Sequence, residues 1–136
     1  MANPTRSDAL PKPVRWVGSS KDDLSAFPED VRRRIGGALW DAQRGLKAPF
    51  AKPLRGFGGA GVLEMVDDHD GDTYRAVYTV RLAGVVYVLH AFQKKSKRGR
   101  VTPKAELDLI KQRLKRATED YEQWSRSEKR EKPISR

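Results

Sequence analysis

The chain has no cysteine and only two histidines, His69 and His90, among its 136 residues. Without cysteine there is no disulfide framework, no thiolate zinc site and no cysteine nucleophile. The longest apolar run, residues 85–92, is far too short to cross a bilayer, and the first residues are prolines and polar side chains where a signal peptide is apolar. We therefore expect a cytoplasmic protein with no membrane segment.

Acidic residues are scarce relative to basic ones. Lys and Arg total 28 against 18 Asp and Glu, which gives a formal net charge of +10. Residues 1–92 hold 13 basic and 11 acidic side chains, whereas residues 93–136 hold 15 and 7. A field of this kind suits a polyanion, because basic patches steer association and bound phosphates release counterions. The alternative is a basic tail that serves solubility alone.

Apolar periodicity and turn signals predict one small domain. The expected elements are a strand at 14–17, a helix from Ser20 (its N-cap) to Phe27, a second helix from Pro28 to a Gly45 cap, strands at 62–66, 73–82 and 85–92, and a last helix capped by Thr102. Asp70-Gly71 predicts a hairpin turn. The fold class is therefore α+β: an antiparallel sheet with two N-terminal helices and a C-terminal helix, all on one face, which leaves the other face for function.

Four segments carry no expected helix or strand. Residues 1–13 are predicted to be a flexible arm and residues 125–136 a disordered charged tail, so the domain spans 14–124. In the loop at 47–61, the glycine-rich stretch 56–61 follows no strand and opens no helix, so we interpret it as a flexible approach to a strand. The acidic turn at 67–72 lacks calcium-ligand spacing and indicates a solvated hairpin. We expect no metal and no cofactor.

Basic residues gather where two expected strands meet. Arg75 interrupts an apolar strand on the same side as Val77, which suggests an open, cationic sheet face. The segment 93–100 holds five basic residues and no acid. In an antiparallel pair the start of one strand meets the end of the next, so we expect Arg75 to lie close to Lys94. Arg55, before the first strand of the meander, borders the same surface.

His90 lies near the end of the last strand and shares side-chain parity with Val86 and Val88. Both parities of this strand are apolar, so periodicity does not say which one faces the helices. Two interpretations stay open: a buried, hydrogen-bonded histidine, and a proton-transfer group at the edge of a site.

Several short motifs follow one another in a recognisable order: Lys-Pro-Leu-Arg-Gly, Val-Leu-Glu, Tyr-Arg-Ala-Val-Tyr, Val-Leu-His-Ala-Phe-Gln-Lys-Lys and a closing Thr-Pro-Lys helix. Over about residues 14–122 they resemble the RelE/HigB toxins of type II toxin-antitoxin systems, particularly the phage-related HigB-like branch. The resemblance implies a small RelE-like domain that acts as a metal-free, ribosome-dependent endoribonuclease on mRNA. It also implies a small antitoxin as partner, often with a helix-turn-helix domain. Val66 departs from the arginine usual at its position.

The resemblance places Arg75 and Lys94 where the family has phosphate-stabilising cations, with Lys95 and Lys97 adjacent. Metal-free cleavage proceeds by attack of the RNA 2′-OH on the neighbouring phosphate, which gives a 2′,3′-cyclic phosphate, and positioned charges carry most of the catalysis. His90 and Glu64 are the candidate bases. The expected RNA-binding residues are Arg55, Lys97, Arg98 and Arg100. Two alternatives remain: a non-enzymatic nucleic-acid-binding regulator, and a ParE-like inhibitor of DNA gyrase on the same fold.

Overall fold

The structure is a computed structural model that describes residues 10–58, 61–94 and 102–131. Its elements along the chain are β1 (Val14–Trp16), α1 (Ser20–Ser25), α2 (Glu29–Gln43), β2 (Ala51–Pro53), β3 (Val62–His69), β4 (Asp72–Thr79), β5 (Val86–Lys94) and α3 (Lys104–Glu131). This order confirms the α+β class with two N-terminal helices and one C-terminal helix. Within the described residues, no helix is long and apolar enough to cross a membrane.

The five strands form one mixed sheet in the order β1-β5-β4-β3-β2. β3, β4 and β5 are the expected antiparallel meander, and β2 joins β3 antiparallel. β1 pairs with β5 in parallel, so the sheet is not wholly antiparallel as expected. The short strand β2 was not predicted, because it contains only three residues, one of them proline, inside a segment with loop composition.

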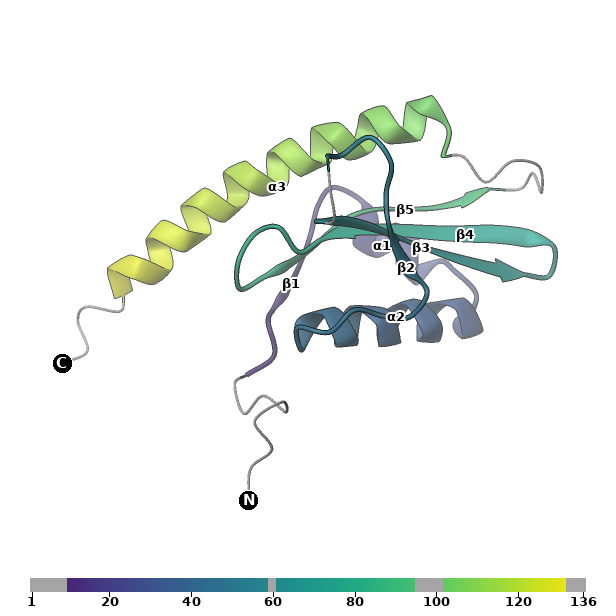
Figure 1. Cartoon of the computed structure of the whole chain (residues 1–136), viewed down its shortest axis with the longest axis horizontal. Helices are drawn as coiled ribbons and strands as arrows, with labels where there is room; N and C mark the ends of the chain where they lie inside the picture. Colours follow the sequence, from purple (N-terminus) through teal and green to yellow (C-terminus); the bar gives the residue numbers. More distant parts are fainter. Residues whose placement is uncertain (1–9, 59–60, 95–101, 132–136) are drawn as a thin grey trace, which may run out of the picture.

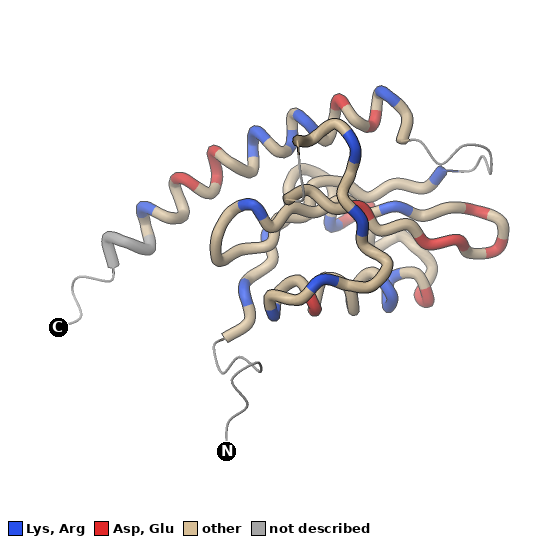
Figure 2. The backbone as a smooth tube through the Cα atoms, viewed as in Figure 1, with Lys and Arg blue, Asp and Glu red and all other residues tan. Residues whose placement is uncertain are grey.

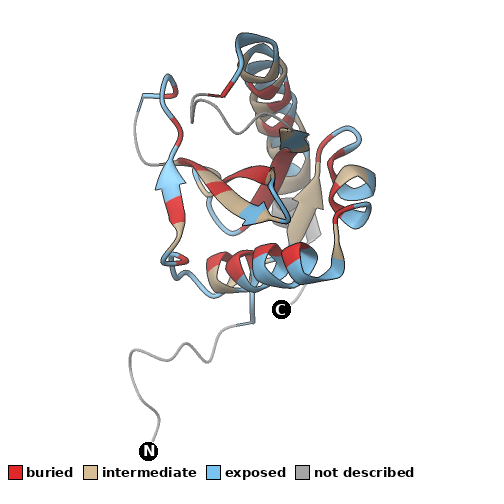
Figure 3. Ribbon diagram, turned by 90° about the vertical axis from the view of Figure 1, so that its right-hand side faces the viewer, coloured by how far each residue is buried: buried red, intermediate tan, exposed pale blue. Residues whose placement is uncertain are grey.

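Helices cover both faces of the sheet, α1 and α2 one face and α3 the other (Figures 1 and 3). The prediction that all helices share one face is wrong. Both faces of β4 and β5 carry buried side chains, and the apolar stripe of α3 needs an apolar surface of its own. The first core lies under α2 around Ile35, Met65 and Tyr78, and the second lies under α3 around Val77 and Ile110.

The hairpin between β3 and β4 follows the sequence signal. Asp70 and Gly71 connect the strands with φ angles of 50° and 85°, and His69 pairs with Asp72. Two central residues with positive φ are what a tight two-residue hairpin needs, and Asp-Gly supplies them at low cost.

The helix ends differ in detail from the expectation. Ser19, not Ser20, is the N-cap of α1, and the buried Ser20 hydroxyl instead donates to the carbonyl of Val88 at 3.1 Å. The helix ends at Ser25 rather than Phe27. In α2 the apolar residues Val31, Ile35, Ala38, Leu39 and Ala42 are buried, whereas Leu46 lies beyond the helix and is 52% exposed.

Both ends of the described chain are more ordered than expected. The backbone N–H of Lys12 donates to the carbonyl of Gln43 at 2.9 Å, so this residue of the arm is attached to the C-terminal end of α2. Residues 125–131 continue α3 as helix, so the prediction of a disordered tail from residue 125 is wrong for them. Residues 1–9 and 132–136 lie outside the described residues.

Candidate active site on the α3 face of the sheet

A buried ion pair joins two neighbouring strands on the face that α3 covers. Arg75 of β4 donates from Nη1 to Oε2 of Glu64 on β3 at 2.8 Å. Arg75 is 2% exposed, so the prediction that it lies on an open cationic face is wrong. It does share its side with Val77, but that side is the second core. A buried guanidinium requires such a partner, because taking an ion out of water costs several kcal/mol.

Thr102, two residues before α3, completes this group. Its Oγ1 donates to Oε2 of Glu64 at 2.8 Å and accepts a hydrogen bond from Nη1 of Arg75 at 3.2 Å. The contact fixes the start of α3 over the sheet. Sequence reasoning gave Thr102 a capping role only, since no local pattern indicates a partner 38 positions away.

Glu64 and Thr102 are part of the wall of a pocket of about 360 Å³, which we call the Glu64 pocket. Its other lining residues are Lys52, Pro53, Leu54, Arg55 and Leu107. Lys52 lies opposite Glu64 in the β2–β3 ladder, and such cross-strand partners have Cβ atoms about 4.5–5.5 Å apart. Figure 2 shows basic positions on the segment that leads from β2 toward α3. Lys52 was missed because β2 was not predicted.

The charges around the Glu64 pocket are unequally matched. Arg75 neutralises Glu64 from within the protein, whereas Lys52 and Arg55 form no ion pair with any described residue. Both hydrogen bonds of Glu64 end on Oε2, so Oε1 accepts none within the same part of the chain. The pocket therefore offers one carboxylate oxygen that can accept a proton and two cations that can hold a phosphate.

Lys94 extends the same face at the end of β5. The register pairs Arg75 with Phe92 and Thr73 with Lys94, so Arg75 and Lys94 are diagonal neighbours on adjacent strands. This agrees with the proximity expected from the sequence. Four further predicted residues, Lys95, Lys97, Arg98 and Arg100, lie outside the described residues.

A β-bulge decides where His90 points. Tyr78 pairs with Val88 and Val77 with His90, which leaves Leu89 without a partner in the ladder. An extra residue in one strand reverses the alternation beyond it. His90 therefore lies on the α3 side with Leu89, and the predicted parity with Val88 is wrong.

The ring of His90 is enclosed by α3. Its Nδ1 lies 3.2 Å from Nη1 of Arg113, and its Nε2 lies 2.6 Å from Oε1 of Glu106. Arginine only donates, so Nδ1 is the acceptor and Nε2 carries the hydrogen that Glu106 accepts. Burial lowers the pKa of the Arg113 guanidinium from its usual value. His90 is 6% exposed, so the first of the two interpretations, a buried and hydrogen-bonded histidine, describes it.

The two N-terminal helices and the C-terminal helix are those that the resemblance implies, whereas the sheet between them is mixed. The family described as phage-derived protein Gp49-like (DUF891) matches residues 22–115. The chain belongs to this family, which confirms the resemblance to the phage-related branch of the RelE/HigB toxins.

Four chains of solved structures match this chain, and the following is among them. It is a chain in the crystal structure of the toxin-antitoxin complex RelBE2 from Mycobacterium tuberculosis, 20% identical to this chain, with a TM-score of 0.42. The match covers 64% of this chain and 95% of that chain. Among curated proteins there is no significant match.

Proposed function

We propose that this protein is the toxin of a type II toxin-antitoxin system and cleaves mRNA on the ribosome without a metal ion. The observation that carries the proposal is the Glu64 pocket, where an anchored carboxylate lies beside Lys52 and Arg55. Membership of the Gp49-like family supports the same assignment.

The proposed reaction begins at the 2′-OH of the bound RNA. Oε1 of Glu64 accepts its proton, and the 2′ oxygen forms a bond to the adjacent phosphorus. The bond from phosphorus to the 5′ oxygen breaks, and that oxygen takes up a proton. The products are a 2′,3′-cyclic phosphate and a 5′-OH end. A positioned general base of this kind contributes about 10²–10⁴-fold to the rate.

The cations divide into two roles. Lys52 and Arg55 hold the non-bridging phosphate oxygens as charge develops on them, and one such preorganised donor contributes about 10²–10³-fold. Lys94 and Lys95 remain the candidates for protonating the leaving oxygen. Arg75 is a positioning residue, because its guanidinium binds Glu64 behind the wall of the pocket.

The test is primer extension on mRNA from a reconstituted translation reaction. Glu64→Gln keeps the size of the side chain but removes the base, and we expect cleavage to fall at least about 100-fold. Arg55→Ala and Lys52→Ala should each reduce cleavage by about two to three orders of magnitude. The matched control is Lys21→Ala, an exposed lysine on α1 at the opposite face, which should cleave normally.

The chemistry of the RNA ends supplies a second readout. The upstream fragment should resist phosphatase until acid opens the cyclic phosphate. If Glu64→Gln cleaves at the rate of the unchanged protein, Glu64 is not the base. If the protein cuts no mRNA but blocks DNA supercoiling by gyrase, the endoribonuclease assignment is wrong.

The partner we expect is a small antitoxin, often of helix-turn-helix type in the family that the sequence resembles. Co-expression of a small reading frame adjacent to the gene should restore growth that the toxin arrests. Growth that stays arrested with every adjacent reading frame would contradict this part of the proposal.

A further inference from the structure

β1 is an edge strand with one unpaired side. In its parallel ladder with β5, the N–H of Val17 donates to the carbonyl of Val88 and the N–H of Val86 donates to the carbonyl of Pro13, both at 3.0 Å. Alternate residues of a strand point their backbone groups to opposite sides, so the N–H and C=O of Val14 and Trp16 point away from the sheet. None of these four groups has a hydrogen bond within the described residues.

The opposite edge of the sheet is protected. β2 contains Lys52 and Pro53, and a charged lysine and a proline without an N–H are two devices that keep a further strand from adding. β1 has the sequence Val-Arg-Trp and contains no proline. Of the two edges, β1 is therefore the one whose backbone can accept another strand.

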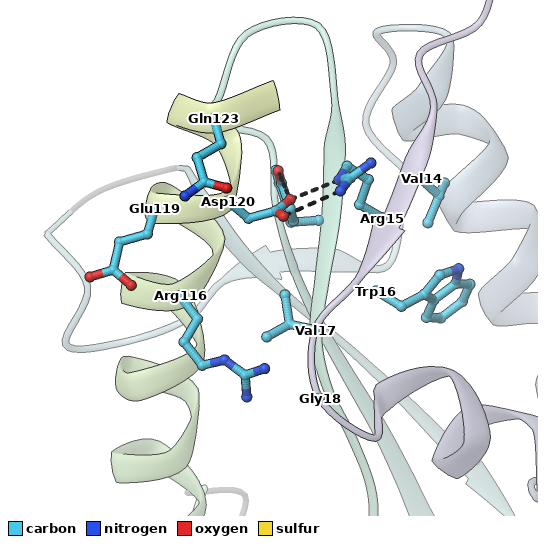
Figure 4. Close-up of a pocket in the computed structure, with 10 residues that line it drawn as sticks. Val14, Arg15, Trp16, Val17, Gly18, Arg116, Glu119, Asp120 and Gln123 are labelled. Carbon is cyan, nitrogen blue, oxygen red and sulfur yellow. Dashed lines mark hydrogen bonds and ion pairs between the residues drawn. The ribbon is translucent and has the colours of Figure 1, made fainter. Parts of the chain in front are cut away.

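A pocket of about 530 Å³ runs beside this edge, between β1 and α3 (Figure 4). Its lining includes five consecutive residues, Val14 to Gly18, which run along the strand itself. Asp120 on α3 is already engaged by Arg15, at 2.8 and 3.2 Å, and by the hydroxyl of Tyr87 at 2.6 Å. This group closes one end of the pocket and needs no further partner.

Arg116 is the cation of this pocket that can bind an acidic group of a partner. In Figure 4 its guanidinium extends toward Val17 and Gly18, whereas Glu119 extends away from β1. Arg116 forms no ion pair within the part of the chain that the structure describes. A carboxylate entering from the β1 side would meet it directly.

We propose that the β1 edge is the docking site for an extended segment of a partner protein, which adds to the sheet as a sixth strand. Side chains of an added strand alternate between the two faces. Those on the α3 side enter the pocket, where an acidic residue pairs with Arg116. Those on the other side meet Trp16, which is half-buried against the first core. Main-chain hydrogen bonds supply affinity, and the alternating side chains supply specificity.

Charge favours a different protein over a second copy of this chain as the occupant. Two β1 strands can pair across a two-fold axis, but each copy carries a formal net charge of +10. Self-pairing therefore brings like charge to like charge, whereas an acidic segment is attracted.

The test starts with a library of random twelve-residue peptides on phage, selected against the whole protein. A selected peptide is then synthesised, and its affinity is measured by fluorescence anisotropy. Val14→Pro removes one outward N–H and leaves the ladder to β5 intact, as edge positions allow. Arg116→Glu reverses the charge at an exposed position. Each change should weaken binding about tenfold or more, and changing the acidic residue of the peptide to lysine should restore binding to Arg116→Glu.

Amide hydrogen exchange locates the contact. On peptide binding the amides of Val14 and Trp16 should become protected, whereas those of Arg15 and Val17 should change little because β5 already holds them. Circular dichroism checks that Val14→Pro is folded, and the charge reversal gives an independent answer if it is not.

Three results would overturn the proposal. The selected peptides could bind both variants with unchanged affinity, amide protection on peptide binding could be confined to other strands, or the library could yield no binder. The oligomeric state of the free protein is measured by light scattering. If the unchanged protein is a dimer and the Val14→Pro variant is a monomer, the edge binds a second copy of this chain instead. The selection uses no RNA, so its failure leaves the proposed cleavage untouched.

Discussion

Replacing Arg75 by alanine should destabilise the fold strongly, whatever it does to RNA cleavage. The side chain of Arg75 is 3% exposed and that of Glu64 is 13% exposed, so the truncation leaves a largely buried carboxylate with only Thr102 as a donor among the described residues. Breaking a buried pair on one side costs about 3–5 kcal/mol. In a domain of this size, each kcal/mol corresponds to about 4 °C in Tm, so we expect a loss of about 12–20 °C.

The assay is urea unfolding followed by the fluorescence of the three tryptophans. Glu64→Gln with Arg75→Met removes both charges, so the double variant should be more stable than Arg75→Ala alone by about 1–3 kcal/mol. The control is Arg33→Ala. Arg33 pairs with Glu29 at 2.8 Å, but both side chains are more than two-thirds exposed, and the change should stay within about 0.5 kcal/mol.

A cost below about 1 kcal/mol for Arg75→Ala would refute the buried pair in solution, because an accessible pair is worth no more than that. The same result would return Arg75 to the surface and make it a candidate for direct phosphate contact. Growth assays on Arg75→Ala cannot separate these roles, since an unfolded toxin is also inactive. Glu64→Gln keeps an oxygen that accepts from Arg75 but leaves the guanidinium without a carboxylate, so its stability is measured by the same urea titration before its cleavage rate is interpreted.

Three further changes test other parts of the structure by the same urea titration. The hydrogen bond from Arg15, and next that from Tyr87, holds the pKa of Asp120 below its ordinary value of 3.8, so the stabilisation is present above that pH and is lost as pH falls through the folded pKa. Asp120→Asn should cost up to about 1 kcal/mol at pH 7, since both Arg15 and Asp120 are partly exposed, and progressively less as the pH falls below 3.8. Burial raises the pKa of Tyr78 to about 12, and its hydroxyl has no hydrogen-bond partner within the described residues. Tyr78→Phe should therefore be neutral or stabilising by up to about 1 kcal/mol, and a loss above that would reveal a missing partner. Deleting Leu89 makes the ladder regular and leaves His90 facing α3, but it removes a fully buried leucine from the second core. Stability should therefore fall by about 2–5 kcal/mol, and an unchanged midpoint would contradict the place assigned to Leu89.

The elements that the sequence predicted well are those whose signal is local. The meander follows from two alternating apolar stretches and the Asp70-Gly71 turn, whose residues tolerate positive φ. β2 has no such signal, since pairing with β3 alone makes an extended strand of a proline-containing loop. The helix at residues 125–131 lacks apolar periodicity. It continues because its residues are good helix formers and propagation adds one hydrogen bond per residue.

The candidate site was predicted in part. Glu64 and Arg55 do line one pocket, and Lys94 does lie beside Arg75. The face was misjudged because both sides of the central strands are apolar, and alternation does not reveal which helix covers which side. The orientation of His90 depends on an unpaired residue at Leu89, which is a property of the ladder and not of the strand that contains it.

The number of basic residues is therefore a poor measure of the charge that the protein offers to a polyanion. The guanidinium of Arg75 is balanced by Glu64, that of Arg15 by Asp120 and that of Arg34 by Asp67. An arginine balanced in this way fixes a carboxylate in place and adds no net attraction for phosphate. The attraction beside the carboxylate comes from Lys52 and Arg55, on a strand and loop that the sequence did not distinguish from irregular chain. In the proposed mechanism, such a site separates the group that orients the base from the groups that hold the substrate. Substitution of Lys52 or Arg55 should then lower activity without the loss of stability expected for Arg75.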